Sequence, residues 1–320
     1  MPLQTGVFLD LESVDRGDLN RGRLEAVCRA WRWHVATQPL ETGSRIREAD
    51  VVVSNKVVLD RAALEQTSQL RLVCVAATGT NNVDLDVARE LGIAVANVTG
   101  YATPSVVQHV FSLILALTTR LMDYQRAVGA GAWQHSRQFC LLDYPSRELA
   151  GLSLGIVGYG ELGRAVARVA EAFGMHVLLA QRPGGQPQQG RLPLHELLPR
   201  VDVLTLHCPL TAETRNLVGT GELALMKPDA LLINTARGGI VDEQALLRAL
   251  REGRLGGAGI DVLGQEPPRG GSPLLAADIP NLIVTPHIAW ASRESRQRLL
   301  DEVAENIRAF DAGQVRNRVV

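Results

Sequence analysis

The 320-residue chain lacks a surplus of charge of either sign, because 33 basic and 34 acidic residues leave a formal net charge of −1. No block of like charge stands out, which argues against nucleic acid and membrane surfaces as partners. The four cysteines are widely scattered and form no Cys-x-x-Cys pair. Three of them lie in apolar surroundings, so we expect reduced, buried thiols and no metal site.

Signals for export and for membrane insertion are missing as well. Residues 1–5 contain neither the basic segment nor the apolar segment of a signal peptide. The longest apolar helical stretch, 106–117, is too short to span a bilayer. Apolar residues make up 46% of the chain, which is ample for buried cores, and the length predicts two domains. We therefore expect a soluble, cytoplasmic enzyme of two domains.

What the chain does contain is a glycine-rich turn near its middle. Residues 155–164 read GIVGYGELGR, with Gly158, Gly160 and Gly163 in a Gly-x-Gly-x-x-Gly pattern. An apolar run directly precedes the turn, and a helical pattern, 162–173, follows it. In such a unit the first glycine allows a tight turn, the second admits a pyrophosphate, and the third allows close helix–strand packing. The pattern predicts a dinucleotide site at the helix N-terminus; the alternative is a tight turn without a ligand.

Strand-like and helix-like segments alternate along the first hundred residues. Continuous apolar strands between helices are typical of a parallel sheet that is covered on both faces. The expected strands are 7–11, 51–53, 72–75 and 93–96, and the expected helices are 19–29, 59–65 and 83–91. This part therefore predicts one complete α/β layer structure before the glycine-rich turn.

The second part begins with a long helix, expected from Pro104 to about Arg126. An irregular excursion rich in aromatic residues follows over 129–148, and we expect it to pack on a partner subunit in a homodimer. Strands and helices then alternate again, as in a doubly wound dinucleotide-binding sheet. The six expected strands are 152–157, 177–180, 203–207, 230–234, 257–261 and 282–285.

The expected fold class is α/β, with two Rossmann-like domains, one flavodoxin-like and one dinucleotide-binding, and a cleft between their parallel sheets. A last helix, 292–310, follows the complete second sheet, so we expect it to return to the first domain. The substrate domain would then comprise 1–100 and 290–320. The cofactor domain would comprise 101–289, including the long hinge helix and the excursion.

Polar residues stand at the carboxyl ends of the later strands, where open α/β sheets bind their ligands. These ends read His207-Cys208-Pro209, 234–239 (NTARGG), Asp261, and Thr285-Pro286-His287. Arg237 lies between a buried strand and a Gly-Gly turn, where a guanidinium can hold a carboxylate through two parallel bonds. The alternative is a surface arginine that caps the helix starting at Asp242.

A histidine and a glutamate make the other candidate pair. His287 follows a proline directly after an apolar strand, and histidine gives and takes a proton near neutral pH. Glu266 could pair with His287 and fix its tautomer. Each of them alone would be read as structural, but both beside a nicotinamide site predict acid/base catalysis.

These segments resemble the signature blocks of the D-isomer-specific 2-hydroxyacid dehydrogenases. The matching blocks are 231–242 (LLINTARGGIVD), 259–262 (GIDV) with Glu266-Pro267, and 285–290 (TPHIAW). The resemblance extends over essentially the whole chain, in the family's order. Residues 101–110 and 139–145 are similar to the glycerate dehydrogenase (hydroxypyruvate reductase) branch.

The resemblance implies a role for each candidate of the second part. His287 becomes the general acid/base, with Glu266 as its partner. Arg237 binds the substrate carboxylate and polarises the carbonyl, and Asp261 lies near the nicotinamide.

In the first part, the resemblance implies that Ala77, Thr78 and Gly79 bind the substrate, through the backbone N–H groups of Thr78 and Gly79. The alternative is a strand–helix turn capped by Asn81 or Asn82.

The cofactor is expected to contact residues at most of these strand ends. The expected set is Thr103, Gly158, Gly160, Glu161, Leu162, Gly163, Gln181, Arg182, His207, Cys208, Pro209, Thr214, Thr235, Ala236, Arg237, Asp261, His287 and Ala289.

The residue after the second strand of the dinucleotide unit decides between NAD and NADP. Enzymes that use NAD place an acid there, on the ribose hydroxyls. This chain has the neutral Gln181, followed by Arg182, which could pair with a 2′-phosphate. We predict that NADPH is accepted or preferred over NADH. The alternative is that Gln181 still binds the ribose and Arg182 points to solvent.

The sequence predicts a 2-hydroxyacid dehydrogenase that works as an NAD(P)H-dependent 2-ketoacid reductase on hydroxypyruvate or glyoxylate. A first alternative is another branch of the family, such as phosphoglycerate or phosphite oxidation, although residues 76–84 contain no basic side chain for a phosphorylated substrate. A second is a non-catalytic nucleotide-binding co-repressor, which would be expected to lack His287.

Overall fold

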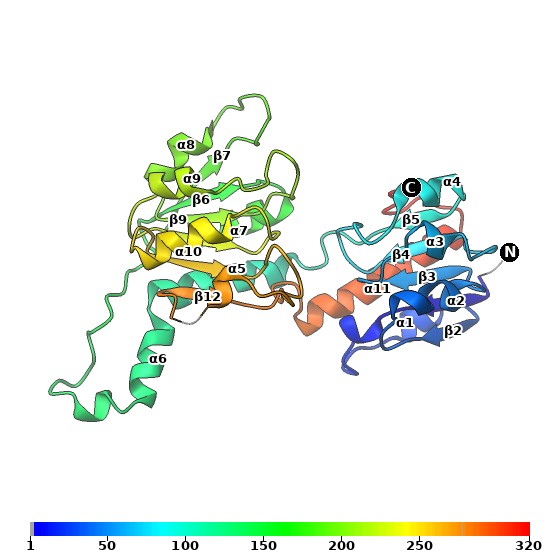
Figure 1. The fold of residues 1–320 in the computed structure, drawn as a ribbon, viewed down its shortest axis with the longest axis horizontal. Coiled ribbons are helices and arrows are strands. Elements are labelled where there is room, and N and C mark those ends of the chain that lie inside the picture. Colours follow the sequence, from blue (N-terminus) through cyan, green and yellow to red (C-terminus); the bar gives the residue numbers. More distant parts are fainter. Residues whose placement is uncertain (1–2, 277) are drawn as a thin grey trace. The chain divides into compact units, whose positions relative to one another are not determined.

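The computed structural model describes residues 3–276 and 278–320 (Figure 1). The chain divides into two compact units, the first formed by Met1–Ala102 and Trp290–Val320 and the second by Thr103–Ala289. Each unit has its own parallel sheet, and buried apolar residues pack against that sheet.

The first unit is built on a five-stranded sheet in the order β2-β1-β3-β4-β5, with every pair parallel. Its strands are β1 (Thr5–Phe8), β2 (Ala30–Trp33), β3 (Val51–Ser54), β4 (Leu72–Val75) and β5 (Ala94–Ala96). Its helices are α1 (Gly22–Glu25), α2 (Thr42–Ile46), α3 (Arg61–Leu64), α4 (Leu85–Glu90) and α11 (Arg293–Asp311).

Alternate residues along the central strands enter two different cores. Val51 and Val53 of β3 pack with the buried residues of α11, whereas Val52 packs with those of α2, α3 and α4. Because successive strand side chains point to opposite faces, an unbroken apolar run fits a sheet that is covered on both sides. Helix α11 thus completes one core of this unit although it comes last in the chain.

Strand β2 was not predicted, and the helix expected over 19–29 is reduced to Gly22–Glu25. The reason is that β2 lies at the edge of the sheet, where only alternate side chains are half-buried. Trp31 and Trp33 stack with their ring centroids 4.8 Å apart and pack against the core, while Arg32 is exposed. Such a strand shows no apolar run.

The second unit has a seven-stranded parallel sheet in the order β12-β11-β10-β9-β6-β7-β8. Its strands are β6 (Ser153–Val157), β7 (His176–Ala180), β8 (Arg191–Leu192), β9 (Val203–Leu206), β10 (Leu231–Asn234), β11 (Gly257–Ile260) and β12 (Leu282–Val284). The six predicted strands are present with small shifts of their ends, and the two-residue β8 is additional. The strand order reverses between β6 and β9, and this switch point is where such sheets bind ligands.

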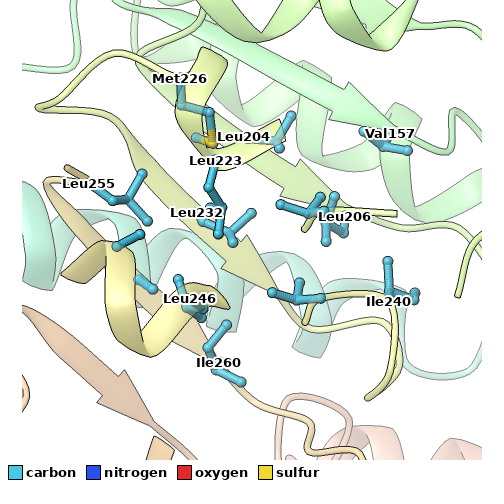
Figure 2. Packing of buried hydrophobic residues seen from close by; sticks show 14 of the residues in the cluster. Val157, Leu204, Leu206, Leu223, Met226, Leu232, Ile240, Leu246, Leu255 and Ile260 are labelled. Atoms are coloured by element: carbon cyan, nitrogen blue, oxygen red, sulfur yellow. The ribbon is translucent and has the colours of Figure 1, made fainter. Parts of the chain in front are cut away.

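Helices cover both faces of this sheet (Figure 1). They are α5 (Thr103–Thr118), α6 (Leu121–Gly129), α7 (Glu161–Ala172), α8 (Leu194–Leu197), α9 (Thr220–Leu225) and α10 (Glu243–Arg251). Figure 2 shows one core, in which Leu232 of β10 packs with Leu223 of α9 and Leu246 of α10. On the other face, a side chain at Gly259 of β11 would lie 3.0 Å from Leu113 of α5, so α5 packs closely on the sheet.

The single helix expected from Pro104 to about Arg126 is two helices, α5 and α6, which are bent by 60° relative to each other. Thr118 and Thr119 direct their hydroxyls back to the carbonyls four residues earlier, an arrangement that bends helices. Arg120 then adopts a left-handed conformation with φ of 56°. Among the described residues, no single helix is long and apolar enough to cross a membrane; only the bent pair meets the criteria of length and composition.

Candidate active site

The glycine-rich turn connects β6 to α7, and each glycine has a different reason to be there. Gly158 has φ of +96°, and a side chain on it would lie 2.6 Å from the backbone nitrogen of Cys208. A side chain on Gly163 would lie 2.2 Å from the carbonyl oxygen of Gly158, so this glycine allows α7 to pack against the turn. A side chain on Gly160, the N-cap of α7, would meet nothing within 4 Å. The helix N-terminus therefore faces open space, which fits a pyrophosphate.

Two buried polar atoms at the ends of neighbouring strands have no hydrogen-bond partner among the described residues. They are Nδ1 of His207, after β9, and Oγ1 of Thr235, after β10. The other ring nitrogen of His207 lies 3.0 Å from Oγ1 of Thr205, and burial lowers the pKa of His207 to about 4. Such unpartnered polar atoms are costly unless a ligand satisfies them. Both belong to the set predicted for the cofactor, so the site fits a dinucleotide.

Other residues of the predicted cofactor set make contacts within the protein. The Thr214 hydroxyl donates to the carbonyl of Pro209, so it closes the loop after β9. The Thr103 hydroxyl donates to the Glu161 carboxylate over 2.6 Å, which ties the start of α5 to the start of α7. Cys208 and Ala236 are buried, while Pro209 is exposed and Leu162 is half-buried.

At the end of β7, Gln181 is half-buried and its backbone N–H donates to Leu192 of β8. Arg182 is exposed. The Glu213 carboxylate, from the loop after β9, accepts a hydrogen bond from the Thr211 hydroxyl and is also near Arg182. The hydroxyl contact, with a smaller contribution from the positive charge of Arg182, lowers the pKa of Glu213. The negative charge of Glu213 therefore acts on Arg182.

The structure brings His287 and Glu266 together. Nδ1 of His287 lies 2.5 Å from Oε2 of Glu266, and both side chains are 33% exposed. The second carboxylate oxygen of Glu266 accepts the N–H of Leu263 over 2.8 Å, which fixes the carboxylate in the loop after β11. The contact at Nδ1 leaves Nε2, on the other side of the ring, directed away from Glu266.

Arg237 lies in the turn after β10, and its side chain is exposed. One of its guanidinium nitrogens donates to the carbonyl of Ala236 over 2.7 Å. The buried Asn234 shapes this turn, because its amide donates to the carbonyl of Arg237 and accepts the N–H of Ala236. The alternative role of Arg237 as a cap of α10 is wrong, since the side chain of Asp242 accepts the first N–H groups of that helix.

The loops that carry Arg237 and Glu266 are packed against each other. A side chain on Gly238 would lie only 1.8 Å from the carbonyl oxygen of Leu263, whose N–H binds Glu266. Since Glu266 in turn contacts His287, the ends of β10, β11 and β12 form one continuous group. The structure therefore places Arg237, Glu266 and His287 at one edge of the sheet, the edge that carries the glycine-rich turn.

Asp261 follows β11 and makes several contacts within the protein. Its side chain has no exposed surface, and its carboxylate accepts the hydroxyl of Thr285 and the N–H groups of Ile288 and Ala289. The carbonyl of Ala289 accepts the hydroxyl of Ser105. The Asp261 side chain and the backbone of Ala289 thus hold the loop that carries His287. The sequence analysis did not predict that Asp261 holds this loop or that Asn234 shapes the turn of Arg237. Both residues are polar and stand at the end of a buried strand, and this position was the available signal.

In the first unit, the loop after β4 carries Ala77, Thr78 and Gly79. The Thr78 hydroxyl donates to the carbonyl of Val98 over 2.9 Å, which anchors the loop to the segment after β5. Within the described part of the chain, the N–H groups of Thr78 and Gly79 have no hydrogen-bond partner, so a carboxylate can use them. The alternative, a helix cap from Asn81 or Asn82, is wrong.

That cap comes from Asp84, whose carboxylate accepts the N–H of Val87 at the start of α4. Asn82 instead donates to the carbonyl of Val57 over 3.0 Å.

Comparison with known proteins gives consistent matches. A family model described as the NAD binding domain of D-isomer specific 2-hydroxyacid dehydrogenases matches residues 111–289. The chain is 48% identical over 314 residues to a glycerate dehydrogenase of Methylorubrum extorquens, with 98% of each chain covered.

Two solved structures share the fold of this chain. A protein of Thermus thermophilus is 34% identical and superposes with a TM-score of 0.86 over 99% of this chain and 100% of that one. An NADPH-dependent glyoxylate/hydroxypyruvate reductase of Sinorhizobium meliloti, solved with NADP and malonate, is 27% identical, with a TM-score of 0.81 over 99% and 97% of the two chains.

The fold, the glycine-rich turn and these matches define an oxidoreductase that uses a nicotinamide dinucleotide and acts on the CH–OH group of its donor. Within that class, the chain belongs to the D-isomer specific 2-hydroxyacid dehydrogenase family. The 48% identical relative supports the glycerate dehydrogenase branch that residues 101–110 and 139–145 resemble.

Proposed function

We propose that the protein reduces hydroxypyruvate and glyoxylate to D-glycerate and glycolate with NADPH or NADH. The observation that carries this proposal is the 2.5 Å contact between His287 and Glu266, at the sheet edge that also carries Arg237. The names of the two relatives, a glycerate dehydrogenase and a glyoxylate/hydroxypyruvate reductase, support the substrate class.

The residues divide the chemistry among them. The N-terminus of α7, His207 and Thr235 would hold the cofactor, which when bound supplies a hydride for the carbonyl carbon. Arg237 binds the substrate carboxylate and polarises the carbonyl. In the first unit, the N–H groups of Thr78 and Gly79 are suited to bind a carboxylate.

His287 supplies the proton. Its protonated ring is held by Glu266, whose negative charge stabilises the imidazolium. The ring then donates a proton from Nε2 to the alkoxide that develops on the former carbonyl oxygen, which removes the charge that would raise the barrier.

Initial rates with hydroxypyruvate, glyoxylate and pyruvate, each with NADH and with NADPH, test the activity. We expect the highest kcat/KM for hydroxypyruvate or glyoxylate. Phosphohydroxypyruvate serves as the probe for the phosphoglycerate branch, and its preferred turnover would contradict the substrate proposal. Absence of turnover with every pair would favour the non-catalytic co-repressor, although that alternative does not explain why His287 and Glu266 are paired.

We propose that the preference between NADPH and NADH depends on Arg182 and on Glu213. Glu213 is an anion that would compete with a 2′-phosphate for Arg182. Because Arg182 is the cation next to Gln181, the R182A variant is expected to lower kcat/KM for NADPH by about tenfold and to change that for NADH little. The E213Q variant should act in the opposite direction, since it removes the acid that competes for Arg182. Steady-state kinetics with both cofactors measure this, and an unchanged NADPH/NADH ratio in both variants would contradict the assignment.

We also propose a homodimer formed through α6 and the excursion that follows it. This segment exposes large apolar side chains, with Phe139 90% exposed. The others are Leu121, Met122, Val128, Trp133 and Leu142. An apolar surface of this kind is typical of an interface between subunits.

Light scattering should give the mass of two chains for the native protein and of one chain for the L121D/M122D variant. A native mass of one chain would contradict the dimer.

A further inference from the structure

His287 has an unusual backbone conformation. Its φ is 53°, in the left-handed region that a residue with a side chain seldom adopts. Such a conformation persists only where surrounding contacts hold it. The direction of the imidazole therefore depends on what fixes the backbone of the loop 285–289.

Asp261 holds this loop through three consecutive N–H groups. Its carbonyl accepts the N–H of His287 over 2.8 Å, and its two carboxylate oxygens accept those of Ile288 and Ala289, each over 2.9 Å. These bonds define the left-handed turn only while the carboxylate keeps its orientation.

Thr285 and His109 fix that orientation. The Thr285 hydroxyl donates its proton to Oδ1 of Asp261 over 2.5 Å. Nε2 of His109 lies 2.9 Å from the same hydroxyl oxygen and 3.5 Å from Oδ1. Because the hydroxyl has one proton and Asp261 receives it, Nε2 of His109 must carry the hydrogen of the other bond.

His109 lies on a helix that is packed firmly against the sheet. It lies on α5, which packs closely on β11 through Leu113 and Gly259, two residues before Asp261. One turn earlier on the same face of α5, the Ser105 hydroxyl donates to the carbonyl of Ala289 over 2.7 Å. Helix α5 therefore contacts both ends of the loop that carries His287.

We propose that His109 is a positioning residue for His287. Its Nε2–H fixes Thr285, Thr285 fixes the Asp261 carboxylate, and the carboxylate fixes the turn that directs the imidazole toward the reacting oxygen. The proposal rests on the proposed function in one respect, namely that His287 supplies the proton. The proposal also gives a role to His109, a residue of the 101–110 block that is not among the proposed substrate or cofactor contacts.

The variants H109L and H109Q separate the hydrogen bond from packing. Leucine removes the donor, whereas glutamine places an N–H close to the position of Nε2. We expect H109L to lower kcat for hydroxypyruvate by about 10- to 100-fold, because small misplacements of a catalytic group have effects of this size. H109Q should stay within about threefold of the native kcat, and the KM for the cofactor should change less than about twofold in both. The control is Q108L, at the exposed neighbouring position on α5, which should be unaffected.

The reacting step provides a second readout. With a reduced cofactor deuterated at the transferred position, the isotope effect on kcat should be larger in H109L than in the native enzyme, because the chemical step becomes slower. A merely structural loss of folded protein would lower the amount of active enzyme and leave the isotope effect unchanged. The T285V variant removes the hydroxyl that His109 contacts, so it breaks the same hydrogen bond. It replaces H109L in the test if H109L does not fold.

A native kcat in H109L, or an H109Q variant as slow as H109L, would overturn the proposal. The H109L change added to H287A should lower the remaining turnover by less than about twofold, since His109 acts only through His287. Full additivity would also overturn the proposal. An undiminished turnover in H287A alone would instead remove the proposed function, so the two failures are distinguishable.

Discussion

Replacing His287 by alanine is expected to lower kcat for keto acid reduction by about 10³-fold. The variant lacks the imidazole at the end of β12 that would protonate the developing alkoxide, and Glu266 loses its contact with that ring. Binding of the cofactor should survive, because the glycine-rich turn, His207 and Thr235 are unchanged. Initial rates at saturating concentrations measure the first effect, and quenching or enhancement of nicotinamide fluorescence measures the second.

Two further variants make this experiment specific. H195A removes a histidine that is 73% exposed on α8 and should retain native turnover. E266Q keeps an acceptor for Nδ1 of His287 but removes the charge, so its kcat should fall by about 10- to 100-fold, between the native enzyme and H287A. A kcat for H287A within about tenfold of the native value would remove His287 as the proton donor.

Replacing Arg237 by glutamine is expected to lower kcat/KM for hydroxypyruvate by about 10³-fold. The guanidinium is the exposed cation of the turn after β10, and the variant loses both the grip on the carboxylate and the polarisation of the carbonyl. R237K retains the charge without the planar pair of donors, so its kcat/KM should lie between those of the native enzyme and R237Q.

A substrate without a carboxylate distinguishes the two contributions of Arg237. Hydroxyacetone has a methyl group in place of the carboxylate of hydroxypyruvate. The native enzyme should prefer hydroxypyruvate strongly, and R237Q should lose most of that preference. R251Q, at an exposed position on α10, is the matched control and should keep it. If R237Q retained the native ratio of kcat/KM for the two compounds, Arg237 would not be the residue that binds the carboxylate.

The dinucleotide unit could be predicted from the sequence because its signals are local. The apolar run of β6, the three glycines and the helical period of α7 lie within one short segment, and each reflects a backbone requirement of its own position. Buried central strands such as β4 were predicted for the same reason, since both of their faces are covered and their sequence is apolar throughout.

Elements whose stability depends on distant contacts were missed. Strand β2 has an alternating, half-exposed sequence and is recognised only by its pairing with β1. No glycine or proline marks the break between α5 and α6. The break is associated with the hydroxyl bonds of Thr118 and Thr119 and with the left-handed conformation of Arg120.

The chemical groups at the strand ends could be predicted without the structure, because the period of apolar residues places each strand and the next residue is then known. Arg237, His287 and the glycine-rich turn follow from that argument. The contacts among these groups depend on how distant parts of the chain pack. Glu266 meets His287 across 21 residues, a pairing that the sequence suggested without its geometry, and His109 meets Thr285 across 176, a contact that the sequence did not suggest. Hydrogen bonds of this kind depend on how loops from different strands pack, as Gly238 does against Leu263, and no local pattern encodes that distance.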